Sequence, residues 1–86
     1  MSWNHRVLAS EHKYVDGTTE MYFEVYEVYY DKDGKPDGYT ANPITIGGDS
    51  LEGLRWTADR IKEALSKPIL WEGDRFPEEY TKVKEL

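Results

Sequence analysis

Two glutamates inside an aromatic segment are the residues of this sequence best suited to acid–base chemistry. Glu24 and Glu27 lie among the aromatic and β-branched residues of segment 20–30. A carboxyl group in apolar surroundings is easier to protonate, as a general acid requires. The competing interpretation is a structural ion pair of Glu27 with Arg6 or Arg55, because an unpaired buried carboxylate is costly. We expect the ion pair, and we therefore predict no catalytic residue and no enzymatic activity.

Nucleophilic catalysis lacks its usual components in this chain. It needs a serine or a cysteine beside a base. The sequence has no cysteine and two histidines. His5 falls in a predicted strand and His12 in a predicted loop, and no serine occupies a strained strand-to-helix turn. We expect both histidines to be surface or half-buried residues.

Two segments resemble ion-binding loops without meeting their requirements. Residues 31–34 (DKDG) are similar to the start of a calcium loop, but the glycine comes too early and Asn42 stands where an EF-hand has glutamate. Turn chemistry accounts for this segment. Residues 47–48, both glycine, precede a predicted helix whose N-terminus could receive an anion. Asp49 and Glu52 would repel that anion. We predict no metal site and no cofactor.

Strand signals predict the sheet that must position these residues. Residues 3–9 alternate between two faces, and residues 20–30 give the strongest strand signal. The turn-rich residues 31–38 would return the chain into a third strand over residues 39–46. Residues 69–71 form a fourth strand or pack over the sheet. The fold class predicted is α+β, with a three-stranded or four-stranded antiparallel sheet packed by one helix.

The second strand raises the question of how both faces of the sheet are covered. Met21, Phe23 and Val25 share a face, but the next residue on that face is Glu27. Either a bulge within residues 24–27 changes the phase, or both faces are partly covered. Four tyrosines could supply a second, aromatic face for a ligand or a dimer: Tyr22, Tyr26, Tyr29 and Tyr39.

The helix predicted over residues 50–66 has an apolar stripe at helical spacing. Asp49 or Ser50 would cap it, and Pro68 follows its end. At about 100° per residue, Trp56 lies almost opposite the centre of the stripe. The stripe consists of Leu51, Leu54, Ala58, Ile61 and Leu65.

Trp56 therefore needs a covering partner outside the predicted core. Gly53 lies one turn before it and Arg60 one turn after, with Glu63 and Lys67 nearby. Glycine costs a helix about 1 kcal/mol relative to alanine, so a small residue here indicates a close approach. Arg60 can stack on the indole. The first hypothesis is that Trp71, Phe76 or Tyr80 folds back over Trp56. The second is that a homodimer or a protein partner docks on the face formed by Gly53, Trp56, Arg60 and Glu63.

Composition limits the remaining function classes. The 86 residues predict a single α+β domain over residues 1–71 and a charged tail over residues 72–86. In that tail, Pro77 could open a short helix carrying Phe76, Tyr80 and Val83 on one side. The absence of cysteine and of a signal peptide favours a cytoplasmic protein. A net charge of −6 disfavours direct nucleic-acid binding, and no apolar run could span a membrane.

Short motifs share an order and spacing across roughly residues 2 to 70. Together they resemble a group of small uncharacterised bacterial and phage proteins, in which a tyrosine is expected where this chain has His5. The topology is loosely similar to that of HicB-type antitoxin domains. The resemblance implies no assigned activity. The motifs are Trp3-Asn4-His5-Arg6-Val7, Glu27-Val28-Tyr29-Tyr30-Asp31 with Asp33-Gly34-Lys35-Pro36, Asn42-Pro43, Ser50-Leu51-Glu52 with Leu54-Arg55-Trp56, and Lys67-Pro68-Ile69-Leu70.

These observations predict a non-enzymatic, acidic protein–protein interaction module that forms a homodimer or binds another protein. Such a module could inhibit or regulate a host defence or nucleic-acid enzyme. The alternative is a protein that binds a small ligand or a nucleotide in an aromatic dimer cleft formed by the four tyrosines.

Overall fold

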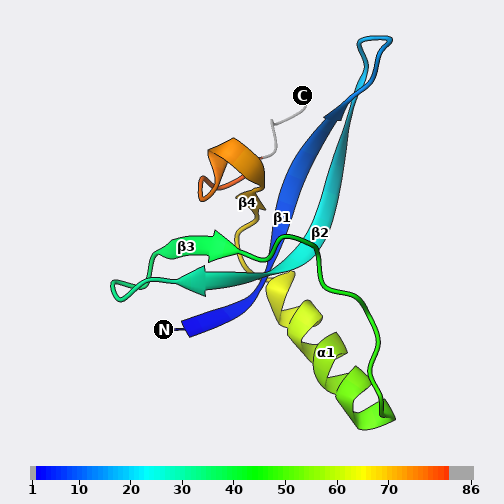
Figure 1. Cartoon of the computed structure of the whole chain (residues 1–86), viewed down its shortest axis with the longest axis vertical. Coiled ribbons are helices and arrows are strands. Elements are labelled where there is room, and N and C mark those ends of the chain that lie inside the picture. Colours follow the sequence, from blue (N-terminus) through cyan, green and yellow to red (C-terminus); the bar gives the residue numbers. More distant parts are fainter. Residues whose placement is uncertain (1, 82–86) are drawn as a thin grey trace.

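Two long antiparallel strands are the framework of the fold in the computed structural model, which describes residues 2–81 (Figure 1). β1 (Ser2–Lys13) and β2 (Thr19–Tyr30) pair in one unbroken register. Their far ends project beyond the other elements as a two-stranded arm (Figure 1). β1 is longer than the predicted strand over residues 3–9, because the turn between the strands is tighter than expected. Tyr14 N–H donates to Thr18 C=O at 2.8 Å, and Gly17 adopts the positive φ of 91° that the turn requires.

The α+β class is confirmed, but the sheet is mixed. Its strand order is β3-β2-β1-β4. β3 (Pro36–Tyr39) pairs antiparallel with β2, whereas β4 (Leu70–Trp71) runs parallel to β1. The prediction of a purely antiparallel sheet is wrong, because the chain reaches β4 only after crossing over through the helix. A crossover connection of this kind brings a strand back in the parallel direction.

The third strand lies earlier in the sequence than predicted. Residues 40–46, expected in a strand, lie outside any ladder. They still run along β2, since Thr40 N–H donates to Glu27 C=O at 3.0 Å and Ile44 N–H donates to Val25 C=O at 2.8 Å. Pro43 lies between these two contacts and has no N–H to donate. The regular ladder therefore ends at Tyr39.

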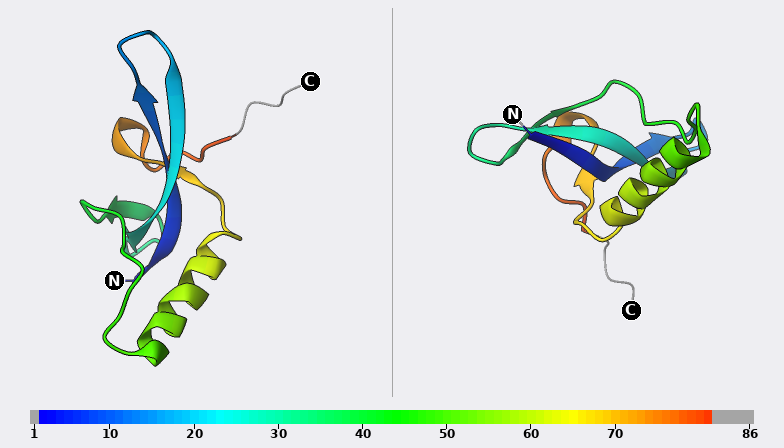
Figure 2. Two further views of the ribbon diagram at one scale, coloured as in Figure 1. Left: turned by 90° about the vertical axis from the view of Figure 1, so that its right-hand side faces the viewer. Right: turned by 90° about the horizontal axis from the view of Figure 1, so that it is seen from below.

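Both faces of the sheet are covered, and no bulge is needed for this. The register of β1 with β2 is continuous through Glu24 and Glu27, so the predicted bulge is absent there. Figure 2 (left) shows α1 on one side of the β1–β2 pair, and β3 with the short helix after β4 on the other side. The main core lies on this second side. It comprises Leu8, Tyr26, Val28 and Leu70, with Tyr30, Tyr39 and Phe76 packed against them.

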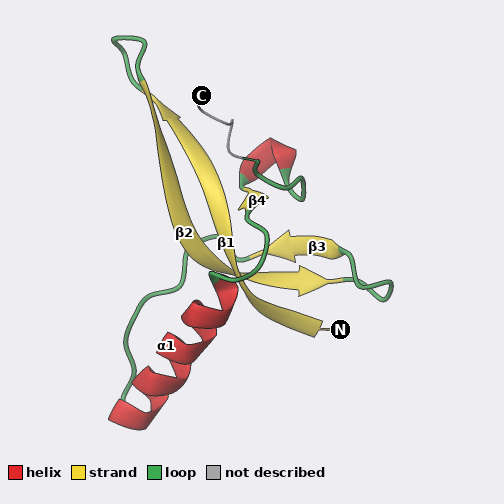
Figure 3. Ribbon diagram, turned by 180° about the vertical axis from the view of Figure 1, so that it is seen from behind, coloured by secondary structure: helices red, strands yellow, loops and turns green. Residues whose placement is uncertain are grey.

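The helix α1 (Leu51–Ala64) begins close to its predicted start, and the structure selects Ser50 as its cap. The Ser50 hydroxyl accepts a hydrogen bond from Gly53 N–H at 3.0 Å. A long loop from β3 runs beside α1 to reach this end (Figure 3). The cap satisfies one of the N–H groups that a helix start leaves without a partner.

The rotation of α1 about its own axis differs from the expected one. Ala64 is buried, and Leu54, Thr57 and Ile61 are half-buried. Leu51 and Leu65, which belong to the predicted inner stripe, are 63% and 69% exposed. The buried face is turned by roughly 60° from the apolar stripe, toward Trp56. We attribute this to the short Thr57 and Ala64 side chains, which let α1 lie against β1.

The C-terminal segment is part of the packed structure. A short 3₁₀ helix covers Gly73–Arg75, and residues 77–79 are not helical, so the predicted helix does not begin at Pro77. Trp71 N–H donates to Glu78 C=O at 2.8 Å, which holds this segment against β4. Phe76 stacks on Tyr39 with ring centroids 4.7 Å apart. The predicted partner Val83 lies outside the described residues.

Candidate functional site

Trp56 lies beside the N-terminal half of β1. Its ring meets the edge of His5 at a centroid distance of 6.3 Å and an angle of 73°. Trp3 meets the other side of His5 at 5.4 Å and 88°. His5 is 6% exposed, whereas Trp3 and Trp56 are 47% and 50% exposed. A buried imidazole therefore lies between two half-exposed indoles.

Local structure explains how these three rings meet. Trp3 and His5 are two residues apart on β1, so both side chains point to the face that α1 covers. The rotation of α1 brings Trp56 to the edge of that face. The Nδ1 atom of His5 is buried and has no hydrogen-bond partner within residues 2–81. The imidazole is held here by packing against the two indoles.

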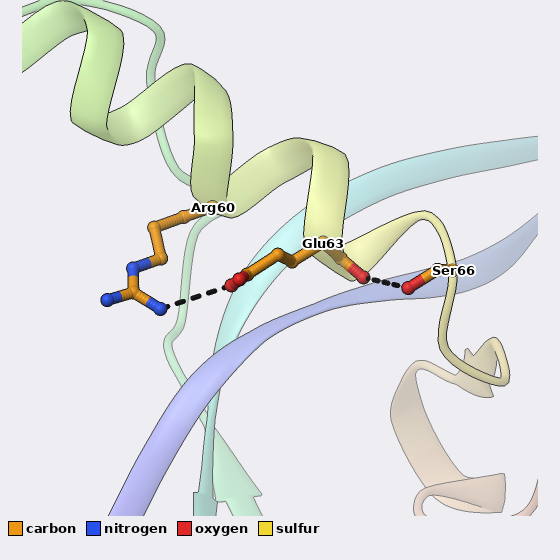
Figure 4. Close-up of polar contacts among 3 residues, drawn as sticks. All are labelled: Arg60, Glu63 and Ser66. Carbon is orange, nitrogen blue, oxygen red and sulfur yellow. Dashed lines mark hydrogen bonds and ion pairs between the residues drawn. The ribbon is translucent and has the colours of Figure 1, made fainter.

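Arg60 lies next to Trp56 on α1 and adds a cation to the group formed by Trp3, His5 and Trp56. Its guanidinium carbon lies 5.1 Å from the centroid of the Trp56 ring. One terminal nitrogen of Arg60 also contacts Glu63 Oε1 at 3.1 Å, and Ser66 donates to the Glu63 carbonyl at 2.7 Å (Figure 4). An exposed pair of this kind adds little stability. It does orient the guanidinium along the surface of α1.

These side chains surround a hollow of about 270 Å³, which we call the aromatic cleft. A second, shallower hollow of about 410 Å³ lies on the other side of the same rings, toward Glu27 and the loop after β3. Trp3, His5 and Trp56 line both hollows and so form a wall between them. The aromatic cleft is lined by Trp3, Asn4, His5, Trp56, Arg60, Glu63 and Lys67.

The cleft contains three of the four residues predicted for the Trp56 face. Gly53 does not line it. A side chain at Gly53 would instead meet the Ser50 hydroxyl at 3.2 Å, so the close approach inferred there is made by the helix cap. Sequence reasoning missed Trp3, Asn4 and His5 as members of the site, whereas Lys67 was expected near Trp56. The i, i+2 spacing of Trp3 and His5 was the available signal, but their distance from Trp56 in the sequence concealed the contact.

The C-terminal segment does not cover Trp56 in the part of the chain that the structure describes. Trp71 contacts Tyr80 at 5.2 Å, and Tyr80 contacts Phe23 at 5.4 Å. Phe76 packs in the core on the opposite side of the sheet. The hypothesis that one of these rings folds over Trp56 is wrong. Trp71 and Tyr80 pack together next to Phe23 of β2, and Phe76 packs in the core.

The four tyrosines predicted to form one aromatic surface are distributed over different places. Tyr26 and Tyr39 meet edge to face at 5.4 Å within the core. Burial, followed by the charges of Glu24 and Glu72, raises the pKa of Tyr26. Tyr22 lies on the exposed arm, and Tyr29 points to the opposite face of β2 from Tyr26. The register thus leaves no shared tyrosine surface.

The expected ion pair of Glu27 does not form. Arg6 points to the opposite face of β1, where it donates to Tyr30 Oη at 2.7 Å and to the Pro68 carbonyl at 2.6 Å. Residues 2–81 contain a single ion pair, between Arg60 and Glu63, so Arg55 does not neutralise Glu27 either. Glu27 accepts a hydrogen bond from Tyr29 at 3.0 Å, which raises the pKa of that tyrosine. Half-burial leaves Glu27 partly hydrated, so it needs no cation.

Two further observations concern the whole described chain. No helix among residues 2–81 combines the length and the apolar character needed to cross a membrane. Over the same range, no group of three or more His, Cys, Asp or Glu side chains is placed to hold a metal ion.

Comparisons with known protein families, with curated proteins and with solved structures found no match.

Proposed function

We propose that this protein is a non-enzymatic binding module that docks a protein partner on the aromatic cleft. The observation on which the proposal rests is the pair of half-exposed indoles, Trp3 and Trp56, held apart by the buried His5. Tryptophan and arginine are the residues that most often anchor protein interfaces. Arg60 lies on the Trp56 ring and adds the second kind of anchor.

The surroundings of the rings have the composition of an interface. Asn4, Glu63 and Lys67 form a polar rim around the aromatic centre, and interfaces commonly combine an apolar centre with such a rim. The hollow of about 270 Å³ has room for a large aromatic side chain of a partner. With a net charge of −6, the proposed role is regulation or inhibition of an enzyme through protein contact.

The experiment is selection of peptides from a random library against the wild-type protein. Selected peptides are measured by fluorescence anisotropy on the wild type and on Trp56→Ala and Trp3→Ala. We expect each substitution to weaken binding by about tenfold or more, since interface tryptophans contribute about 2 kcal/mol.

Arg60→Ala and Arg75→Ala form a matched pair for this test. Both arginines stack on a tryptophan, but Arg75 stacks on Trp71 outside the cleft, at 4.2 Å. Arg60→Ala should weaken peptide binding and Arg75→Ala should not. Failure to enrich any peptide, or peptides that bind Trp56→Ala as tightly as the wild type, would contradict the proposal.

A small planar ligand is the second candidate occupant, because the site is concave and polar groups converge on it. Asn4, Arg60 and Lys67 all line the same hollow as the two indoles. Small-molecule sites combine an apolar or aromatic lining with a few placed polar groups. A thermal-shift screen of nucleotides and aromatic carboxylates tests this alternative. Stabilisation of the wild type that Trp3→Ala abolishes, without any selected peptide, would favour it over protein binding.

A further inference from the structure

The apolar stripe of α1 is largely left outside the core. Leu51 is 63% exposed and Leu65 is 69% exposed, and Ala58 between them is also exposed. Ile46, from the loop that runs beside α1, is 74% exposed. Burying leucine or isoleucine side chains of this size stabilises a complex, so a continuous apolar strip is a typical docking surface.

The strip borders a groove. Ile61 from α1, Ile44 and Ile46 from the neighbouring loop, and Val25 from β2 line a hollow of about 180 Å³. Pro43 and Glu24 complete its lining. The groove therefore has an apolar floor, with α1 as one wall and the loop as the other.

The spacing of the strip is that of a helix-packing seam. Leu51, Ala58 and Leu65 are seven residues apart, and Leu54 and Ile61 lie three residues after the first two of them. Alternating steps of three and four residues present knobs for a second helix. The small Ala58 at the middle of the seam allows the two helix axes to approach closely.

The charges beside the seam distinguish between possible partners. Arg55 and Lys62 both lie on its outer flank, about 60–80° from the seam centre, with Asp59 one row further round. Neither basic residue takes part in the ion pair found within residues 2–81. In a two-fold dimer with antiparallel helices, this flank would face its own copy, so Arg55 would approach a second Lys62. A partner with acidic residues at that flank would complement both cations.

We propose that the groove beside α1 docks an amphipathic helix of another protein, with its apolar face on the Leu51–Leu65 seam and acidic residues facing Arg55 and Lys62. Glu24 of β2, which also lines the groove, favours neutral or basic residues on the other flank of that helix. The charges on the two sides of the groove therefore determine how the partner helix is rotated about its own axis when it binds. The surface lies about 180° around α1 from Trp56, so this inference does not depend on the aromatic cleft.

Two labelled synthetic peptides test the inference. Both are three heptads long with leucine at the seam positions, and they differ only in having glutamate or lysine at the flanking positions. Their binding to the full chain is measured by fluorescence anisotropy at nanomolar peptide, where the peptides stay monomeric. The acidic peptide should bind about tenfold or more tightly than the basic one, and its advantage should shrink with added salt.

Substitutions locate the binding surface. Leu65→Gln should weaken the acidic peptide about tenfold, with little effect on folding because the side chain is exposed. The double substitution Arg55→Glu and Lys62→Glu should reverse the preference toward the basic peptide. The double substitution Lys13→Glu and Arg75→Glu is the matched control, since it makes the same change of charge outside α1 and should leave the preference intact.

Several results would overturn the proposal. They are no binding of either peptide, equal binding of both, or an effect of Lys13→Glu with Arg75→Glu as large as that of Arg55→Glu with Lys62→Glu. A measurement of the oligomeric state by light scattering gives a further result that would overturn the proposal. A wild-type dimer that Leu65→Gln dissociates would show that a second copy of this chain occupies the groove.

Discussion

His5 determines the shape of the aromatic cleft at the scale of single residues. Its ring contacts both indoles, and its Nδ1 atom is buried without a hydrogen-bond partner in the described part of the chain. A buried polar atom without a partner reduces stability. His5 therefore contributes through its volume and its ring faces, and its polarity is a cost to the folded state.

Replacing His5 by phenylalanine should raise the free energy of unfolding by up to about 1 kcal/mol, because the ring contacts remain and the unpaired nitrogen is removed. Urea unfolding measured by circular dichroism provides the test. His12→Phe on the exposed arm is the control and should change stability by less than about 0.5 kcal/mol. A loss of more than about 1 kcal/mol on His5→Phe would show that Nδ1 is satisfied in solution.

Asp16 in the tip of the arm gives a prediction about pH. Its Oδ1 accepts hydrogen bonds from the Thr18 N–H at 3.0 Å and the Thr18 hydroxyl at 2.7 Å, and these lower the pKa of the carboxyl group. A folded-state pKa below the unfolded value means that this stabilisation is present above the unfolded pKa and is lost as pH falls through the folded one.

An NMR titration of the Asp16 carboxyl should show this lowered pKa. Thr18→Val removes the hydroxyl donor and should move the pKa of Asp16 upward toward its ordinary value. The Thr18 N–H remains in that variant, so the pKa should return only part of the way. An identical titration curve in the two proteins would mean that the hydroxyl contact does not persist in solution.

At the scale of secondary-structure elements, α1 depends on its cap and on a small interface with the sheet. Only Ala64 is buried within the helix, so packing contributes less than in a helix with a full inner face. The N-terminal cap then matters more to the local stability of this element. Ser50 supplies that cap, whereas Asp49 does not contact the first turn through a capping hydrogen bond.

Ser50→Ala should lower the free energy of unfolding by about 1 kcal/mol, since it removes the acceptor of the Gly53 N–H. Thermal and urea unfolding both report this change. Asp49→Ala is the neighbouring control and should have an effect below about 0.5 kcal/mol. Equal losses in the two variants would indicate that the two residues share the capping role.

For the whole molecule, the C-terminal segment completes the core. Phe76 packs on Tyr39, and Tyr39 packs on Tyr26 of β2. The Tyr39 hydroxyl also accepts a hydrogen bond from Gly73 N–H at 2.7 Å. Residues 73–76 therefore cover the sheet face opposite α1, whereas Tyr80 contacts Phe23 on the other face of β2.

Phe76→Ala should lower the free energy of unfolding by about 2 kcal/mol, because this half-buried ring closes one side of the core. Chemical unfolding measures the loss, and far-UV circular dichroism checks that the fold remains. Tyr14→Ala at the tip of the arm removes a ring of similar size outside the core and should have a much smaller effect. If Phe76→Ala matches Tyr14→Ala, the segment does not pack on the core in solution.

Local patterns in the sequence were sufficient for the strand pair and the helix, whereas the choice of Ser50 over Asp49 as the cap came from the structure. The aromatic and β-branched run of β2 predicts a strand, and Asp49 or Ser50 followed by a helical pattern predicts the start of α1, because both depend on near neighbours in the chain. Tertiary structure decided the rotation of α1 and the parallel direction of β4. It also decided the meeting of Trp56 with Trp3 and His5. These features depend on how distant side chains fill space together, and the spacing of residues along one segment does not encode that.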